Sequence, residues 1–301
     1  MRLETGRWKR NLALHAMLMP GAVFIFLFNY IPLAGIAMSF QKFIPSKGWF
    51  GSKWVGLDNF TYMLRLPDIG QVIYNTVLIA VLKILCGLIV PFLTALLLNE
   101  IRNGLIKKGV QTLIYLPHFL SWVILGGILM DILSMQDGIV NRFLGLFGIE
   151  PIFFLGSNAW FPYTLVLSDT WKEFGFATIV YLAALTAIDP TLHEAAYVDG
   201  AGRWRQTLHV TLPGMAPTIV LLAVLSLGNV LNAGFDQVFM LYSPQVYESG
   251  DIIDTLVYRV GIVETQYSIA AAVGLFKSVI GFVLIAMSYR LAYKYANYRI
   301  F

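Results

Sequence analysis

Apolar residues in this chain gather in six long runs that shorter polar segments separate. The runs cover approximately residues 12–40, 72–98, 110–133, 161–188, 217–241 and 269–293. Each run has the roughly 20 residues that a helix needs to cross a hydrocarbon core of about 30 Å. The pattern predicts an all-α integral membrane protein with six transmembrane helices in one domain, residues 12–293. Residues 1–11 and 294–301 are predicted to be short cytoplasmic ends.

Two of the connecting segments are unusual. Residues 41–71 are too polar to span and rich in aromatic residues, and Trp49 and Trp54 suit a water–lipid boundary. Residues 136–160 contain five Gly or Pro residues and favour an external amphipathic segment over a seventh span. Within the first run, Pro20 and Pro32 are expected to bend the helix.

Composition supports the membrane assignment. The chain has 301 residues, of which 58% are hydrophobic and 13% charged, and its mean hydropathy is +0.71. A soluble domain of this size is far less apolar. The single cysteine, Cys86, lies inside an apolar run, so cysteines cannot build a disulfide framework or a zinc site. Because the basic residues are spread over short loops, the net charge of +4 indicates membrane topology rather than nucleic-acid binding.

The distribution of positive charge predicts which loops lie inside. Of the 21 Lys and Arg residues, 12 fall on the proposed inner segments, 6 on the outer ones and 3 within spans. This bias places both termini, residues 100–108 and residues 189–217 in the cytoplasm, with Lys53, Arg142 and Asp251 outside. The first apolar run is too long for a secretory signal and predicts an uncleaved span.

Residues 189–217 are the longest polar interruption in the second half of the chain and predict two short helices joined by a turn. Asp189 or Thr191 can cap the first helix, and Pro190 suits its first turn. Thr191 and Glu194 have the spacing of a capping box. Gly200 can adopt the left-handed conformation that closes a helix. In the second segment, Trp204 and Leu208 form an apolar stripe, and Pro213 and Pro217 are expected to mark re-entry into the membrane.

This segment resembles a known family. Glu194-Ala195-Ala196, Asp199-Gly200-Ala201, Leu212-Pro213 and Pro217 are similar to the EAA loop in permease subunits of binding-protein-dependent, ATP-driven (ABC-type) importers. The resemblance implies the fold of a type I importer permease, whose EAA loop docks on the ATPase as a coupling helix. The implied coupling residues are Glu194, Ala195, Ala196, Asp199, Gly200 and Ala201.

The resemblance covers nearly the whole of residues 12–293. Gly56-Leu57-Asp58-Asn59-Phe60 and the stretch 171–217 are similar to the sugar-importer branch, and residues 235–259 resemble permeases for complex oligosaccharides such as alginate and pectin fragments. It implies a second, different permease, two ATPase subunits, an external solute-binding protein and an oligosaccharide substrate in the cytoplasmic membrane. The chain has no phosphate-loop motif, so ATP and magnesium would bind the partner ATPase subunits.

Ionisable residues inside predicted spans need a partner or water, since each costs roughly 2.5 to 3.5 kcal/mol on insertion scales. The candidates are Lys83, Asp131, Asp169, Lys172, Glu173, Asp236 and Lys277. Asp169 and Lys172 are spaced to pair on one helix. A structural ion pair and a water-filled pathway are both compatible with this pattern. Asp251 and Asp254 are expected to belong to a solvated external loop.

Polar residues also recur along the fifth predicted span. Asn229, Asn232, Asp236 and Gln237 would share one stripe of a continuous helix. Amide and carboxylate groups suit sugar hydroxyls, so these four are predicted to line the substrate pathway. Trp171, Lys172 and Glu173 of the fourth span complete the predicted pathway set. In the alternative interpretation, the amides bond to neighbouring helices.

Two other functional classes would require features that the sequence lacks. The four histidines form no metal-binding pair, and there is no nucleophile-elbow motif, so the chain is not expected to be an enzyme. A membrane enzyme acting on lipid-linked sugars would need a catalytic carboxylate or metal motif at a membrane face. An ion-driven secondary transporter would need inverted repeats around broken helices. No internal repeat is visible in the sequence.

Overall fold

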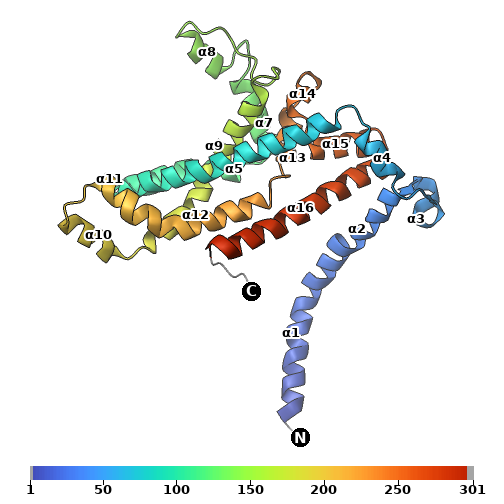
Figure 1. Ribbon diagram of the computed structural model, residues 1–301, viewed down its shortest axis with the longest axis horizontal. Coiled ribbons are helices and arrows are strands. Elements are labelled where there is room, and N and C mark those ends of the chain that lie inside the picture. Colours follow the sequence, from blue (N-terminus) through green and yellow to red (C-terminus); the bar gives the residue numbers. More distant parts are fainter. Residues whose placement is uncertain (1–2, 297–301) are drawn as a thin grey trace. The chain divides into compact units, whose positions relative to one another are not determined.

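The computed structural model describes residues 3–296 and divides the chain into two compact units (Figure 1). The first unit comprises Met1–Leu66 with Val257–Phe276, and the second comprises Pro67–Leu256 with Lys277–Phe301. Residues 1–2 and 297–301 are outside the described part, and with them most of the predicted 294–301 tail.

The first unit begins with a long, apolar helical rod. The rod consists of α1 (Leu3–Ile25), a π-helical turn (Phe26–Tyr30), α2 (Ile31–Leu33) and a 3₁₀ segment (Ala34–Phe40). Residues Leu14–Phe40 are long and apolar enough to cross a membrane. Their large side chains are mostly exposed, as a lipid-facing helix requires. The predicted first span is confirmed as a helix.

The aromatic loop of the first unit is folded around a small hairpin. Strand β1 (Gln41–Lys42) pairs antiparallel with β2 (Lys53–Trp54), with α3 (Gly48–Gly51) between them and α4 (Asp58–Leu64) after them. The side chain of Asn59 donates to the backbone carbonyls of Ser39 and Gln41, each over 2.9 Å. The unit also contains a π-helical turn (Arg259–Val263) and the first part of α16 (Tyr267–Ala296).

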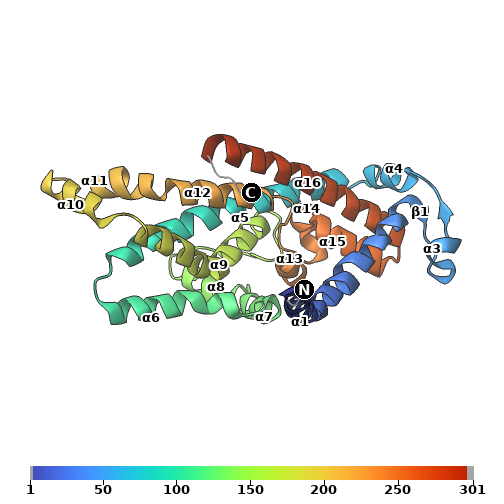
Figure 2. The same cartoon turned by 90° about the horizontal axis from the view of Figure 1, so that it is seen from below.

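The second unit is built on two long helices, α5 (Ile69–Glu100) and α9 (Phe161–Thr186), which lie side by side. Helix α12 (Leu212–Leu227) packs against α5 (Figures 1 and 2). The main core cluster joins α5 and α9 to later elements through Ile79, Leu165 and Val238. This unit also contains the short helices α8 (Ile139–Gly145) and α14 (Tyr247–Gly250), most of α15 (Ile253–Tyr258) and the second part of α16. The short α8 lies in the segment for which no seventh span was predicted.

The third predicted span is not one helix. α6 (Gly104–Tyr115) and a 3₁₀ turn (Leu116–Phe119) meet α7 (Trp122–Ile132) at an angle of 104°. Pro117 lies in the turn and has no amide hydrogen to continue the helical ladder. The side chain of Ser121 then caps α7 by accepting from the backbone amide of Ile124. The third predicted span, residues 110–133, is therefore a bent pair of helices that begins earlier than expected, at Gly104.

The fifth predicted span is also broken, and its helical part starts earlier than expected. α11 (Arg203–Gln206), a π-helical turn (Thr207–Thr211) and α12 (Leu212–Leu227) form one continuous helix. Pro213 therefore does not interrupt the helix, because the preceding π-helical turn has already changed the pattern of backbone hydrogen bonds at this position. Residues 228–234 are not helical, and α13 (Phe235–Leu241) follows. Gly234, directly before α13, has φ +92°, a left-handed conformation that glycine adopts readily.

Four helices of the described residues are long and apolar enough to cross a membrane, and the number rises to six if each bent helix pair is one span. The second bent pair is α9 with α10 (Pro190–Val198), which meet at 68°. The second and sixth predicted spans are confirmed by α5 and α16. The resulting all-helical architecture carries a short polar helix, α10, between the fourth and fifth spans.

Candidate functional site

The polar loop between α9 and α11 is held in one conformation by its own backbone. Asp189 caps α10 by accepting a hydrogen bond of 3.0 Å from the backbone amide of Thr191, so Asp189 is the cap and Thr191 is not. At the other end, the amide of Gly200 bonds to the carbonyl of Tyr197, and the amide of Ala201 bonds to the carbonyl of Ala196. This pair of bonds is a Schellman motif, in which Gly200 takes the left-handed position at φ +73°.

The capping hydrogen bond also affects the charge of Asp189. The backbone amide of Thr191 holds the pKa of the Asp189 carboxyl below its ordinary value of 3.8. The carboxylate is therefore ionised at neutral pH and lies at the positive end of the α10 dipole. Both effects favour the start of α10 directly after the membrane span α9.

The predicted coupling residues lie on the outer surface of this loop. Glu194 and Ala195 are exposed and Ala196 is partly buried, while Asp199, at the end of the helix, is exposed. Tyr197 and Val198 beside them are also exposed, with 76% and 84% of their surface accessible. A rigid helix that presents small and apolar side chains to water is typical of a surface that a partner protein covers.

The loop is connected to the end of α5. Arg203 at the start of α11 donates to Glu100 over 2.9 Å, and both side chains are largely exposed. Behind this ion pair, a cavity of about 560 Å³ is lined by His193 and Trp204 and by the last turns of α5. The exposed pair contributes little stability, but it places the loop at the C-terminal end of α5.

A buried polar cluster lies at the break of the fifth span. The ammonium of Lys83 on α5 donates to the carbonyl of Ala233 over 2.7 Å and to the side-chain oxygen of Gln237, and it pairs with Asp169 at 3.3 Å. Gln237 is fully buried and donates from its amide nitrogen to the carbonyl of Leu165 and the hydroxyl of Ser168, both over 2.8 Å. The cluster joins α5, α9 and α13.

A second polar cluster lies at the bend between α6 and α7. Lys172 pairs with Glu173 at 2.7 Å and donates to the carbonyl of His118 over 3.0 Å. The ring of His118 contacts Glu173 at 2.7 Å and stacks on Phe176. The predicted local pair of Asp169 with Lys172 was therefore wrong, because each residue has a closer partner on another element or in the next position.

The predicted pathway stripe on the fifth span does not exist as a helical stripe, because the helix ends before Asn229 and restarts at Phe235. Asn229 and Asn232 are exposed in the break, and the amide of Asn232 donates to Asn229 over 3.1 Å. Asp236 is exposed in the first turn of α13, whereas Gln237 is buried. The prediction of one continuous face was wrong, although three of the four side chains remain accessible.

Trp171 on α9 directly precedes Lys172 and is partly exposed. It is 44% exposed and lines an apolar cavity of about 340 Å³ with Ile114, Pro117 and Phe174. The structure thus keeps Trp171, Lys172 and Glu173 close to the bend of the third span. Ile114 and Pro117 belong to that bend.

The acidic residues after α14 are not solvated as expected. Asp251 is 2% exposed and accepts from the hydroxyl of Thr255 over 2.7 Å. Asp254 accepts from Lys277 of α16 over 2.6 and 2.8 Å. The expectation of a solvated acidic face was wrong, since a lysine within the sixth span attracts Asp254 and a neighbouring hydroxyl binds Asp251.

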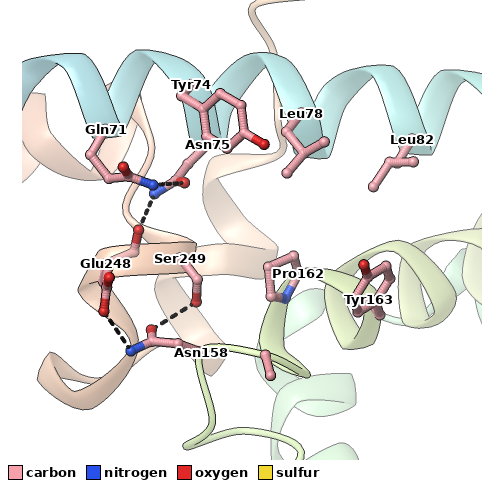
Figure 3. Close-up of a pocket in the computed structure, with 11 residues that line it drawn as sticks. Gln71, Tyr74, Asn75, Leu78, Leu82, Asn158, Pro162, Tyr163, Glu248 and Ser249 are labelled. Atoms are coloured by element: carbon pink, nitrogen blue, oxygen red, sulfur yellow. Dashed lines mark hydrogen bonds between the residues drawn. The ribbon is translucent and has the colours of Figure 1, made fainter.

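A further cavity of about 530 Å³ lies between the first halves of α5 and α9 and is covered by α14 (Figure 3). Asn75 donates to the carbonyl of Glu248 over 3.0 Å, and Asn158 donates to the Glu248 carboxylate over 3.2 Å. Tyr74 and Tyr163 also line it. Because its amides and carboxylate bond to one another, the main role of this polar lining is to hold α14 on α5 and α9.

Bent and broken apolar helices around buried charges, with the exposed helix α10 between two spans, are typical of a membrane permease of the type I importer class. Residues 84–296 match the family described as binding-protein-dependent transport system inner membrane component. The chain belongs to this family. The family and the sugar-importer branch that the loop motifs predicted are confirmed by the relatives below.

Two curated relatives come from Bacillus subtilis (strain 168). The polygalacturonan/rhamnogalacturonan transport system permease protein YteP is 43% identical over 284 residues, which cover 94% of this chain and 88% of the relative. Protein LplB is 40% identical over 277 residues, which cover 92% of this chain and 87% of the relative. The similarity therefore extends over nearly the entire chain.

The fold is also similar to solved structures. A chain in the crystal structure of a bacterial ABC transporter involved in the import of the acidic polysaccharide alginate matches with a TM-score of 0.88 and 38% identity, covering 98% of this chain and 99% of that chain. A bacterial alginate ABC transporter in complex with an alginate pentasaccharide-bound periplasmic protein matches with a TM-score of 0.87 and 37% identity over the same shares.

Proposed function

We propose that this chain is the permease subunit of an ATP-driven importer that moves an oligosaccharide across the cytoplasmic membrane by alternating access. A second, different permease, two ATPase subunits and an extracellular solute-binding protein complete the transporter. The partner subunits hydrolyse ATP and hold magnesium, and this chain performs no catalysis. Both of its termini face the cytoplasm.

The observation that carries this proposal is the rigid, exposed coupling loop. α10 begins at a capped Asp189 and ends in a Schellman turn at Gly200, so its exposed face has a fixed geometry. Glu194, Ala195 and Ala196 enter a groove of the ATPase, where the small alanines allow close approach. Asp199 and Ala201 flank the turn at Gly200. The contact of Arg203 with Glu100 passes a movement of the loop on to α5.

The substrate pathway in this proposal passes the broken fifth span. Irregular backbone at membrane depth is tolerated only where it is buried in protein or lines a water-filled cavity. Asn229, Asn232 and Asp236 are exposed at the break and supply donors and acceptors for sugar hydroxyls. The buried side chain of Gln237 fixes the start of α13 by its hydrogen bonds to Leu165 and Ser168. Trp171 offers an aromatic face beside Lys172 and Glu173.

The proposed substrate class is oligosaccharide, because one relative is named for the transport of arabinooligosaccharides and one solved structure contains a periplasmic protein with bound alginate pentasaccharide. The pathway residues do not favour one charge, because Lys172 is paired with Glu173 and Asp236 adds a carboxylate. Both acidic and neutral oligosaccharides are therefore suitable test substrates.

Uptake into proteoliposomes tests the proposal. The complex of this chain with its copurifying subunits is reconstituted, and uptake of oligogalacturonides and arabino-oligosaccharides is measured with the solute-binding protein outside. We expect uptake that needs ATP and the binding protein and that is insensitive to ionophores. Uptake that proceeds without ATP and collapses with an ionophore would instead identify a secondary transporter.

A variant tests the pathway residues separately. Asn232→Leu removes an exposed amide from the break, so uptake is expected to fall while subunit assembly and basal ATP hydrolysis stay nearly intact. Asn11→Leu is the matched control, because it replaces an exposed amide in α1, far from Asn232 in the sequence. Loss of assembly in Asn232→Leu would show that this amide joins helices, and the pathway would then be assigned to the segment around Trp171.

A further inference from the structure

The break of the fifth span lies deep in the membrane. Lys83 is near the midpoint of α5 (Ile69–Glu100), a helix that is about 48 Å long at the α-helical rise per residue. Its ammonium contacts the carbonyl of Ala233 over 2.7 Å. Residues 228–234 therefore lie close to the centre of the hydrocarbon region, where unsatisfied backbone groups are costly.

The two sides of the break meet this cost differently. On the buried side, Ala233 has no exposed surface, and its carbonyl, which no longer has a helical partner, accepts from Lys83. On the other side, Asn229 and Asn232 are exposed. A polar, non-helical segment of this kind is tolerated at this depth where protein buries it or where it lines a water-filled cavity. Lys83 satisfies the buried face of the loop, and the exposed amides suit a water-filled cavity on the other face.

Each N–H group of the Lys83 ammonium has one hydrogen-bond acceptor. An ammonium group has three N–H donors, and Lys83 has three acceptors: the carbonyl of Ala233, the side-chain oxygen of Gln237 and the carboxylate of Asp169. The lysine side chain is 9% exposed. Gln237 in turn bonds to Leu165 and Ser168 of α9. One side chain therefore connects the C-terminal end of the break and the first turn of α13 to α5 and α9.

The backbone at Gly234 is fitted to this ammonium. A Cβ atom at Gly234 would lie 2.9 Å from the Lys83 nitrogen, and φ is +92°. A side chain at position 234 would be strained and would displace the lysine. Glycine is the residue that lets the lysine reach the carbonyl before it.

We propose that Lys83 is a positioning residue for transport: it holds the fifth span open at residues 228–234, so that Asn229 and Asn232 face the aqueous pathway, and Asp169 supplies its counter-charge. This inference deepens the proposed function and rests on it for the statement that the loop belongs to the transport route. The role of Lys83 in exposing the loop to water is independent of which substrate is carried.

The test separates positioning from charge balance. Lys83→Met alone leaves Asp169 buried without its counter-ion, whereas Lys83→Met/Asp169→Asn removes both charges. Asp169→Asn alone keeps the bonds of Lys83 to Ala233 and Gln237. The pair Lys277→Met/Asp254→Asn is a matched control, because it removes another Lys–Asp pair, one that joins α15 to α16 rather than binding the break.

The readout is the rate at which a cysteine at position 232 reacts with a water-soluble maleimide in the purified, reconstituted complex, in a Cys86→Ser background. Losing two buried hydrogen bonds changes the population of the open loop by about tenfold, so the charge-neutral Lys83/Asp169 variant is expected to react about tenfold more slowly. Asp169→Asn and the Lys277/Asp254 pair are expected to react like the parent protein. Lys83→Arg should react faster than Lys83→Met, because it retains a charge and several donors.

Three results would overturn the inference. The first is an unchanged labelling rate in the charge-neutral variant. The second is an equal reduction in the Lys277/Asp254 control. The third is failure of the charge-neutral variant to assemble while Asp169→Asn assembles, since Lys83 would then be needed for folding. If the parent complex does not transport oligosaccharides but the differences in labelling rate are observed, the proposed substrate class is wrong and the proposed role of Lys83 is still supported.

Discussion

At the scale of single residues, two positions set the shape of the coupling loop. Gly200 ends α10 with a positive φ, and Asp189 starts it with a charged cap. Neither side chain has to contact a partner to affect coupling. Their effect is on the geometry of the helix that carries Glu194 and Ala195.

Gly200→Val is expected to impair coupling to the ATPase. A β-branched residue in the left-handed region costs about 1 to 2 kcal/mol relative to glycine, and the end of α10 would rearrange to avoid that cost. The measurements are copurification of the ATPase subunits and ATP-driven uptake. Gly202→Ala is the control, because Gly202 has φ −66° and open space around a Cβ. Equal behaviour of the two variants would contradict the turn assignment.

The cap at Asp189 is expected to depend on pH. Its pKa is lowered in the folded protein by the amide of Thr191, so its contribution to stability is present above the ordinary value of 3.8 and is lost as pH falls through the lower folded value. Hydrogen exchange of the segment around Thr191 measures this. The Asp189→Asn variant caps the helix without a charge and is the reference. Protection of the backbone amides in the parent protein should be similar to or higher than in this variant at pH 7, and it should decline as the Asp189 carboxylate is protonated at acid pH. A difference from Asp189→Asn that does not change with pH would refute the charge effect.

At the scale of elements, the spans differ in how tightly they are packed. α6 and α9 approach so closely at Gly175 that a Cβ there would lie 1.9 Å from the carbonyl oxygen of Ile114. This contact lies one residue before Tyr115, the last residue of α6, and so helps to place the bend of the third span against Lys172 and Glu173.

Gly175→Ala is therefore expected to destabilise the contact between α6 and α9. Overpacking of a core commonly costs about 1 to 3 kcal/mol, and here the clash is with backbone, which cannot rotate away. Thermal unfolding and the yield of assembled complex are the measurements. Gly87→Ala in the middle of α5, where a Cβ meets nothing within 4 Å, is the matched control. Equal melting temperatures for the two variants would disprove the close approach.

The sequence predicted the uninterrupted helices well and the broken ones poorly. α5 and α16 follow from apolar length alone, because nothing in their tertiary contacts opposes it. The carbonyl of Ala233 at the break after Leu227 bonds to Lys83, which is 150 residues away in the sequence. Gly228 and Gly234 were visible in the sequence, but a glycine within an apolar run is tolerated in many helices. Pro117 was a stronger local signal for the bend of the third span.

The candidate site divides in the same way. The cap at Asp189 and the turn at Gly200 were predictable, since both depend on bonds between residues close in sequence. The ion pairs of Asp169 and Asp254 were not, because their partners Lys83 and Lys277 come from other helices. Local spacing suggested a pair of Asp169 with Lys172 that the tertiary structure does not form.

At the scale of the whole molecule, the second unit has two chemically different ends. At the C-terminal end of α5, Glu100 contacts Arg203 and the coupling loop. At the N-terminal end, Asn75 contacts Glu248, which also binds Asn158 before α9. Because α5 connects these two ends across the membrane, the loop and α14 must face opposite compartments. An importer needs this separation between the ATPase side and the binding-protein side.

The sidedness of these ends leads to the last prediction. Five single-cysteine variants are made in a Cys86→Ser background. Cysteines that replace Lys53, Arg142 and Gln245 should react with an impermeant maleimide in intact cells. Cysteines that replace Lys108 and Arg205 should react only after permeabilisation. All five positions are exposed, whereas Asp251 is buried. A cysteine that fails to react in intact cells is therefore shielded by the membrane and not by burial in the protein. The physical reason is the excess of Lys and Arg on the segments that contain Lys108 and Arg205. Labelling of Arg205→Cys in intact cells, with Gln245→Cys protected, would invert the orientation and place the coupling loop away from ATP.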